Sequence, residues 1–250
     1  MRTIKLLKKN LENKMLSPDM LKHKNILIKI LKDIFTDPTI GPILGFKGGT
    51  AAVLFYGLNR FSVDLDFDLL EIDKKDAVFE RIKNILESYG TIKKAHKKRY
   101  SLFFLLSYNH TSENIHNIKV EINLRSFGSL FEIRSYLGIS MKVMVRSDMV
   151  AHKLVAMYER IGKANRDIFD VWFFLNSGWP INKNIIEKRT GMTYQQFLKN
   201  CIDTLEKMSD RHILSGIGEL LDEKQKIWVK STLRMETIFL LRLALQNASF

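Results

Sequence analysis

The sequence predicts an α+β fold in its first part and an all-helical second part. Strand patterns, either alternating or continuously apolar, occur in three segments, residues 60–70, 99–109 and 118–126. Apolar residues at helical spacing occur in two segments, residues 18–35 and 74–90. From about residue 145 onward, every patterned segment is helical. We therefore expect an α+β domain over residues 1–145 and a helical domain over residues 146–250.

Local signals justify the individual elements. Ser17 and Pro18 predict a helix start, because a capping side chain precedes a proline at the first helical position. The segment TDPTIGP ends this helix, and ILGFKGG predicts a short strand or turn. A buried helix is expected over residues 50–58, and Gly90 ends the helix at 74–90. Four later segments predict helices: residues 146–162, 165–178, 193–209 and 223–246.

The composition limits the class of protein. The chain has 250 residues, 46% of them hydrophobic, which is enough for one large or two small cores. No apolar run reaches the roughly 18 residues of a membrane span, and the basic start MRTIKLLKKNLENK lacks the apolar block of a secretory signal. Cys201, the single cysteine, excludes an internal disulfide framework and a cysteine-rich zinc site. We expect a soluble cytoplasmic protein without a membrane partner.

The formal net charge is +13, more than solubility requires. This charge predicts a polyanionic partner such as nucleic acid, although a lysine-rich composition alone would give the same value. The basic run Lys93–Arg99 is either a solvated face or a strip that contacts RNA.

Three aspartates at alternate positions mark the most informative strand. Asp64, Asp66 and Asp68 share one face, because residues two apart on a strand point the same way. Such a ladder of like charges is unfavourable unless it is solvated or neutralised. It is therefore either a solvent-exposed face or one that holds a cation.

A glycine pair precedes these aspartates at a sequence distance that predicts spatial proximity. A helix from Thr50 to Leu58 runs about 13 Å at about 1.5 Å per residue. A returning strand from Arg60 covers that length in about four residues, at about 3.3 Å each, and so reaches Asp64. The free amides at Gly48 and Gly49 form an anion site, and a divalent metal could join it to the carboxylates.

These residues resemble a known family. A glycine pair, a short helix and Asp-x-Asp on a strand resemble the polymerase-β-like nucleotidyltransferase superfamily, and KGGTAAVLFYGLNRFSVDLDF is similar to the AbiEii/MenT type of nucleotidyltransferase toxin. The resemblance implies a core made of a mixed sheet flanked by helices. It implies Mg²⁺ or Mn²⁺ held by Asp64, Asp66 and, from the segment KVEINL, Glu121. It also implies a nucleoside triphosphate bound by these residues: Lys47, Gly48, Gly49, Thr50, Arg60, Ser62 and, from the later segment NRDIFD, Arg166.

A second element of the same resemblance lies in AHKLVAMYERIGKANRDIFDVWFFL. It assigns Lys153 to the triphosphate, and Asp167 or Asp170 to holding that lysine or contacting the nucleotide. Helical geometry places Lys153 and Arg160 on one face, lets Asn165 cap the next helix and makes Arg166 and Asp170 an i,i+4 pair. The alternative is an ordinary set of surface ion pairs.

The function that follows is metal-dependent transfer of a nucleotide from a nucleoside triphosphate to RNA, with release of pyrophosphate. The resemblance implies the 3′ end of tRNA as acceptor, and a cognate antitoxin as partner. Two other functions stay open on the sequence. One is transfer to a small molecule or a protein side chain, and the other is a catalytically inactive module that binds nucleotide or RNA. The role of Asp68 is open as well.

Overall fold

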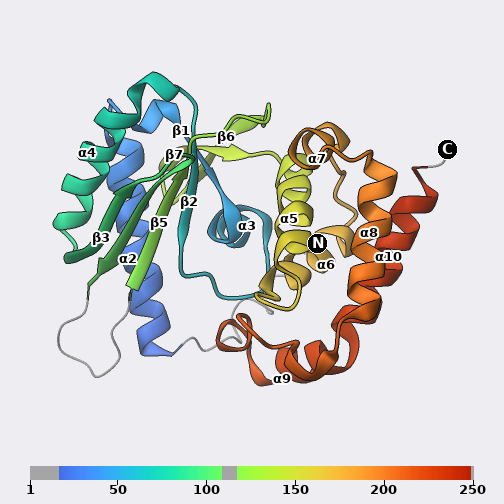
Figure 1. Ribbon diagram of the computed structural model, residues 1–250. Coiled ribbons are helices and arrows are strands. Elements are labelled where there is room, and N and C mark those ends of the chain that lie inside the picture. The colour runs from blue at the N-terminus through green and yellow to red at the C-terminus, as the bar shows by residue number, and fades with distance from the viewer. Residues whose placement is uncertain (1–16, 109–116, 249–250) are drawn as a thin grey trace, which may run out of the picture.

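One mixed sheet of seven strands organises the residues that the computed structural model describes, 17–108 and 117–248 (Figure 1). The strand order across the sheet is β3-β4-β5-β2-β1-β7-β6. Strands β1 and β7 run parallel, as do β2 and β5, whereas the other neighbours are antiparallel. The bounds are β1 Leu44–Lys47, β2 Leu65–Leu69, β3 Thr91–Lys97, β4 Ser101–Ser107, β5 Asn117–Asn123, β6 Phe131–Tyr136 and β7 Ile139–Met144. The predicted α+β class with a mixed sheet is confirmed.

Two helices cover the apolar face of this sheet. Helix α2 (Pro18–Thr36) packs there through Phe35, whose ring centroid lies 6.3 Å from that of Phe46 and 6.1 Å from that of Phe67. Helix α4 (Lys75–Glu87) lies beside α2 and contacts β3 and β4 (Figure 1). Ser17 caps α2 through its side chain, as predicted. The opposite face of the sheet is therefore left for polar side chains.

Helix α3 (Gly48–Tyr56) begins directly where β1 ends and lies between β2 and the later helices in Figure 1. After it the chain returns toward the sheet, but strand β2 starts only at Leu65, not at Arg60 as the alternation predicted. The reason is a competing backbone partner: the Phe61 N–H donates to the Leu220 carbonyl oxygen rather than to a neighbouring strand.

The elements after β7 are helical and form a lobe beside the sheet, residues 146–248, which is called the helical lobe below (Figure 1). Its α-helices are α5 Arg146–Arg160, α6 Arg166–Asn176, α7 Lys183–Thr190, α8 Tyr194–Lys207, α9 Glu223–Trp228 and α10 Arg234–Gln246. The helix expected over 223–246 is interrupted by a π-helical turn, Val229–Leu233. Short 3₁₀ turns occupy Gly41–Ile43, Ile72–Lys74, Asp210–His212 and Gly218–Leu220.

Four elements carry too weak a pattern to be expected from the sequence: β3, β6, β7 and α7. Strands β3 and β6 lie at the two edges of the sheet, where few side chains are buried, so their apolar alternation is faint. The basic run Lys93–Arg99 accordingly lies largely on the edge strand β3, directly before β4. The segment that joins the strands expected over 99–109 and 118–126 lies outside the described residues. No helix in the described part of the chain is long and apolar enough to cross a membrane.

Candidate active site

The predicted acidic residues gather where β2 and β5 run side by side. In this parallel pair Asp66 lies opposite Glu121, and Asp68 lies opposite Asn123. All four point away from the buried apolar face that carries Phe67. Strand pairing across more than fifty residues therefore brings the Asp-x-Asp motif and the third carboxylate together, on the face that α2 and α4 leave open.

An unexpected lysine lies between these carboxylates. The Lys119 Nζ is 3.2 Å from a Glu121 carboxylate oxygen, 3.3 Å from one of Asp66 and 3.9 Å from one of Asp64. We call these four residues the carboxylate cluster. Sequence reasoning missed Lys119, although the alternation in KVEIN places it on the same strand face as Glu121. Burial lowers the pKa of Lys119, but Asp66, Asp64 and Glu121 raise it more, so the ammonium stays charged.

The two aspartates of the motif differ in their electrostatics. Burial raises the pKa of Asp64 above its ordinary value, although Lys119 and Arg166 oppose the shift. For Asp66, burial acts in the same direction, but Lys119, Lys153 and Lys47 together hold its pKa below the ordinary value. Asp66 is therefore the more firmly ionised of the pair.

The glycine pair lets the start of α3 approach the aspartate strand. Gly48 has φ +78°, and a Cβ there would overlap the Asp66 carboxylate. A Cβ at Gly49 would come within 2.7 Å of Arg60 Nη2 and 3.0 Å of Ser62 Oγ. The predicted proximity of glycines and aspartates is thus present, and protein side chains fill the space that both missing Cβ atoms leave.

The hydroxyl groups of Thr50 and Ser62 contact protein atoms beside the start of β2. The Thr50 side chain is buried, and its hydroxyl donates to the Asp64 carbonyl oxygen. The Ser62 Oγ lies 2.9 Å from Thr50 Oγ1. These hydroxyls hold the backbone that precedes β2. The expectation that Thr50 seats a phosphate does not fit this placement.

Asp68, the residue whose role the sequence left open, is part of a bridge across three strands. It is buried, pairs with the Lys47 ammonium on β1 and accepts a hydrogen bond of 2.7 Å from Asn123 Nδ2 on β5. Asp68 therefore fixes Lys47 and Asn123 beside the carboxylate cluster instead of joining it.

The second predicted element forms a buried ion cluster, made of Arg60, Lys153, Arg160, Asp167 and Asp170. Lys153 Nζ lies 2.9 Å from Asp167 Oδ1 and 2.7 Å from Asp170 Oδ2, and Arg160 Nη2 lies 2.7 Å from Asp167 Oδ2. Both aspartate side chains are fully buried. The predicted common face of Lys153 and Arg160 is confirmed, because both reach Asp167.

Arg60 is the fifth member of this cluster and pairs with Asp170. It donates to both Asp170 oxygens, at 2.5 and 2.7 Å, and its side chain is only 2% exposed. Burial would raise the pKa of Asp170, but Arg60 and Lys153 hold it well below its ordinary value. This placement argues against the predicted contact between Arg60 and a nucleotide, since no ligand can reach a guanidinium so buried.

Two expectations about the start of α6 are wrong. Arg166 does not pair with Asp170, because Asp170 points inward to Arg60; its Nη1 lies 3.5 Å from Asp64 Oδ2 instead. Asn165 precedes α6, but its side chain does not cap the helix. It accepts from the Gly162 N–H and donates to the His212 carbonyl oxygen, and so ties the loop between α5 and α6 to the segment around residue 212.

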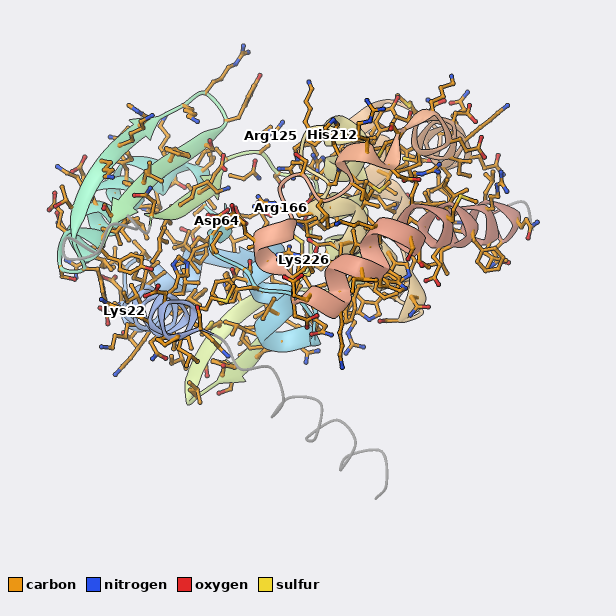
Figure 2. The ribbon with its side chains drawn as sticks, turned by 90° about the horizontal axis from the view of Figure 1, so that it is seen from below. Lys22, Asp64, Arg125, Arg166, His212 and Lys226 are labelled. Carbon is orange, nitrogen blue, oxygen red and sulfur yellow. The ribbon has the colours of Figure 1, made fainter. Side chains whose placement is uncertain are left out.

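A cavity of about 420 Å³ lies between the polar sheet face and helices α5 and α6. Figure 2 shows Asp64, Arg125 and Arg166 in this region between the sheet and the helical lobe. Its basic lining residues are Lys47, Lys119, Arg125, Lys153, Arg160, Arg166 and Arg189. Its acidic lining residues are Asp66, Glu121 and Glu159. Seven basic against three acidic side chains make the cavity suited to a polyanion.

The carboxylate cluster offers the hard oxygen donors that Mg²⁺ and Mn²⁺ take. In the described part of the chain, however, no three acidic, histidine or cysteine side chains converge closely enough to hold a metal by themselves. The Lys119 ammonium is the cation that lies among the carboxylates of Asp64, Asp66 and Glu121. The donor set therefore fits a divalent cation together with phosphate oxygens, provided that Lys119 moves aside.

Comparisons with known proteins agree on one family and one fold. The sequence model of the family described as "Nucleotidyl transferase AbiEii toxin, Type IV TA system" matches residues 29–227. A candidate nucleotidyltransferase from Helicobacter pylori has a similar structure, with TM-score 0.61, 20% identity and coverage of 94% of this chain and 98% of that chain. For JHP933 from the same species the TM-score is 0.59 and the identity 21%, over 94% and 96% of the two chains.

A third similar structure is that of MenT4, a nucleotidyltransferase toxin from Mycobacterium tuberculosis H37Rv. Its TM-score is 0.55 and its identity 16%, over 86% of this chain and 82% of that chain. No curated protein sequence matches this chain. At these identities the likeness between structures shows a shared fold.

Proposed function

The chain belongs to the AbiEii nucleotidyltransferase toxin family of type IV toxin–antitoxin systems, and we propose that it transfers a nucleotide to the 3′ end of tRNA with the help of Mg²⁺ or Mn²⁺. Family membership makes it a nucleotidyltransferase with a nucleotide substrate and an antitoxin partner. The metal, the tRNA acceptor and the roles of individual residues belong to the proposal.

One observation carries this proposal: a strongly cationic cavity ends at a cluster of carboxylates. A nucleoside triphosphate combines several negative charges with a reactive phosphorus atom that needs further charge neutralisation. The cavity's seven basic side chains suit the triphosphate, and Asp64 and Asp66 suit a divalent cation that bridges protein and phosphate. When bound, this cation would neutralise phosphate charge and polarise the α-phosphate.

Lys153 is the residue best placed to meet the triphosphate. Its ammonium lines the cavity, while its two carboxylate partners, Asp167 and Asp170, are fully buried behind it. Such a fixed positive charge requires little rearrangement when negative charge develops on the phosphate. Asp167 and Asp170 therefore act as positioning residues for Lys153.

In the proposed reaction the oxygen of an acceptor hydroxyl attacks the α-phosphorus in line. The new oxygen–phosphorus bond replaces the bond to the β-phosphate, and pyrophosphate leaves with both electrons of that bond. The hydroxyl proton passes to the Glu121 carboxylate, which is the most exposed of the three carboxylates. Catalysis rests on positioning and on charge neutralisation.

The sheet offers a path for RNA from the carboxylate cluster to its edge. Across four neighbouring strands, Asp66 lies opposite Glu121, Glu121 opposite Phe103 and Phe103 opposite His96. The Lys98 ammonium lies 4.3 Å from the Phe103 ring centroid, and His96 stacks on the same ring. Single-stranded RNA binds where aromatic side chains offer a stacking surface and basic groups contact its phosphates. This face would lead the acceptor strand into the cavity.

Transfer of label tests the proposal. The protein is incubated with total tRNA, Mg²⁺ or Mn²⁺ and each α-³²P-labelled nucleoside triphosphate, beside Asp66→Ala and, as a matched control, Asp73→Ala. Asp73 is an exposed aspartate on the Ile72–Lys74 turn, outside the site. We expect label to enter tRNA with the wild type and the control, and not with Asp66→Ala. Label that enters only protein or a small molecule would overturn the RNA acceptor, and no transfer from any nucleotide would overturn the reaction.

A further inference from the structure

The Lys119 ammonium lies where a nucleotidyltransferase of this kind would hold a divalent cation. It comes from β5, two residues before Glu121, and its side chain crosses to the neighbouring strand β2. There it lies within 4 Å of carboxylate oxygens from Asp64, Asp66 and Glu121. Its side chain is 24% exposed, and it lines the cavity.

The distances suit an ammonium and not a metal. The carboxylate oxygens lie 3.2 to 3.9 Å from Lys119 Nζ, whereas Mg²⁺ holds oxygens at about 2.0 to 2.1 Å. A divalent ion at this point would need the carboxylates to close in. In this state the cluster is therefore arranged around the chain's own cation.

The charges of the cluster remain unbalanced. Three carboxylates face one Lys119 ammonium, and Arg166 adds a second positive charge 3.5 Å from Asp64. A divalent ion would neutralise the cluster more fully than an ammonium does. The Lys119 ammonium can also move to a second position. Its flexible side chain lines the cationic cavity, where a bound triphosphate would attract it.

We infer that Lys119 is an internal competitor of the catalytic cation, occupying its place until the metal arrives with a nucleoside triphosphate. Free Mg²⁺ then binds weakly, because it must displace a tethered ammonium. The metal–nucleotide complex binds well, because its phosphates give the displaced Lys119 a new partner. This inference rests on the proposed function only in taking Asp64 and Asp66 as the residues that bind the cation.

Manganese binding without nucleotide tests the competition directly. Free Mn²⁺ is titrated by electron paramagnetic resonance against the wild type and Lys119→Met, which keeps the length of the side chain and removes its charge. Lys97→Met is the matched control, since Lys97 also pairs with two carboxylates, those of Asp76 and Glu80, on the exposed surface. We expect Lys119→Met to bind Mn²⁺ at least tenfold more tightly than the wild type, and Lys97→Met to bind within twofold of it.

A double variant, Lys119→Met with Asp66→Asn, should lose the gain if the new affinity resides in this cluster. Equal affinities of the wild type and Lys119→Met would overturn the inference, and so would an absence of Mn²⁺ binding in both. A gain that survives Asp66→Asn would also overturn it, because the ion would then lie elsewhere.

A measurement on the wild type covers the case in which Lys119→Met fails to fold. Acylation of lysines by a soluble active ester is followed by mass spectrometry, with and without Mn²⁺ and a non-hydrolysable nucleoside triphosphate. If the complex displaces the ammonium from the carboxylates, labelling of Lys119 rises or falls at least threefold while that of Lys97 does not change. Unchanged labelling of Lys119 would overturn the inference.

These experiments separate the inference from the proposed function. None of them uses RNA or requires turnover, so a protein that fails to modify tRNA can still show the competition. Conversely, label transfer to tRNA together with unchanged Mn²⁺ affinity in Lys119→Met would uphold the function and refute the competitor.

Discussion

The two ion clusters of this protein use the same side-chain types for opposite purposes. The buried ion cluster sets Arg60, Lys153 and Arg160 around two carboxylates that are fully buried. The carboxylate cluster sets three carboxylates around one ammonium, and its side chains are 16% to 36% exposed. The full burial of Asp167 and Asp170 makes the first a fixed scaffold, because a lost partner leaves a buried charge. Partial exposure and excess negative charge make the second suited to exchanging its cation.

The largest expected effect is a loss of stability when the buried ion cluster loses one carboxylate. Asp170→Asn leaves Arg60, with a side chain only 2% exposed, without its carboxylate partner. We expect a loss of about 3 to 5 kcal/mol in the free energy of unfolding, as is usual when one member of a buried pair is removed. Urea unfolding followed by circular dichroism measures it. Asp73→Asn, at an exposed aspartate, is the control, and a loss below 1 kcal/mol in Asp170→Asn would contradict the view of this cluster as a scaffold.

The next effect concerns function at the other cluster. Asp66→Asn should reduce the rate of nucleotide transfer roughly 10²- to 10³-fold, by analogy with the loss of one preorganised electrostatic group. Its effect on the free energy of unfolding should stay within about 1 kcal/mol, since the group is partly exposed. Single-turnover kinetics and urea unfolding of the same preparation measure the two quantities. A variant that loses stability and activity together would erase the distinction between the clusters.

A smaller effect is expected at the sheet edge. Lys94→Ala with Lys98→Ala removes two exposed positive charges from β3 and its end. We expect tRNA affinity to fall about tenfold at low salt, and the dependence of log K on log salt to become shallower by about 1 to 2. Filter binding at several salt concentrations measures both. The control is Lys29→Ala with Lys32→Ala on α2, which covers the opposite face, and an equal loss in that variant would refute a specific RNA path.

The smallest effect depends on pH and on a neutral side chain beside the cavity. Burial, with Lys47 and Arg189 nearby, lowers the pKa of His152 to about 2. Arg189 Nη1 lies 2.9 Å from Nδ1, which accepts, and Nε2 lies 2.7 Å from Ser129 Oγ. Because the unfolded chain takes up a proton near pH 6.5 and the folded chain does not, stability is lost as pH falls below that value.

Between pH 7 and pH 5.5 this loss should amount to about 1 kcal/mol. His152→Gln should remove that part of the pH dependence, whereas His212→Gln, at an exposed histidine, should retain it. Unfolding by urea across this pH range provides the measurement. Identical pH profiles for the wild type and His152→Gln would show that His152 takes up its proton in the folded state too.

The sequence was sufficient for residues whose neighbours are local. Alternation alone placed Asp64, Asp66 and Asp68 opposite the apolar face, and the glycine pair pointed to the start of α3 beside Asp66. It could not identify partners, because these depend on strand order and on rotamers. Lys119 reaches the aspartates only because β2 and β5 are neighbours, which no local pattern reveals.

The failed pairing of Arg166 with Asp170 follows the same rule. Their spacing permits an i,i+4 contact, but Asp170 faces inward to Arg60, more than a hundred residues away in sequence. The edge strand β3 was missed for a different reason. Little of its surface is buried, so it carries few apolar residues and no clear strand pattern. Sequence patterns therefore indicated which charged residues gather at the candidate site, and tertiary contacts decided which charges meet.

The segment that leads into the aspartate strand is held by both parts of the chain. The Phe61 N–H donates to the Leu220 carbonyl oxygen, and Gln225 Nε2 donates to the Asn59 carbonyl oxygen, both 2.5 to 2.9 Å long. His23 Nε2, from helix α2, lies 3.0 Å from the Val63 carbonyl oxygen. The position of the aspartate motif thus depends on hydrogen bonds with helix α2 and with the helical lobe. The helical lobe therefore supplies backbone and side-chain partners to a segment that lies more than 150 residues before them in sequence.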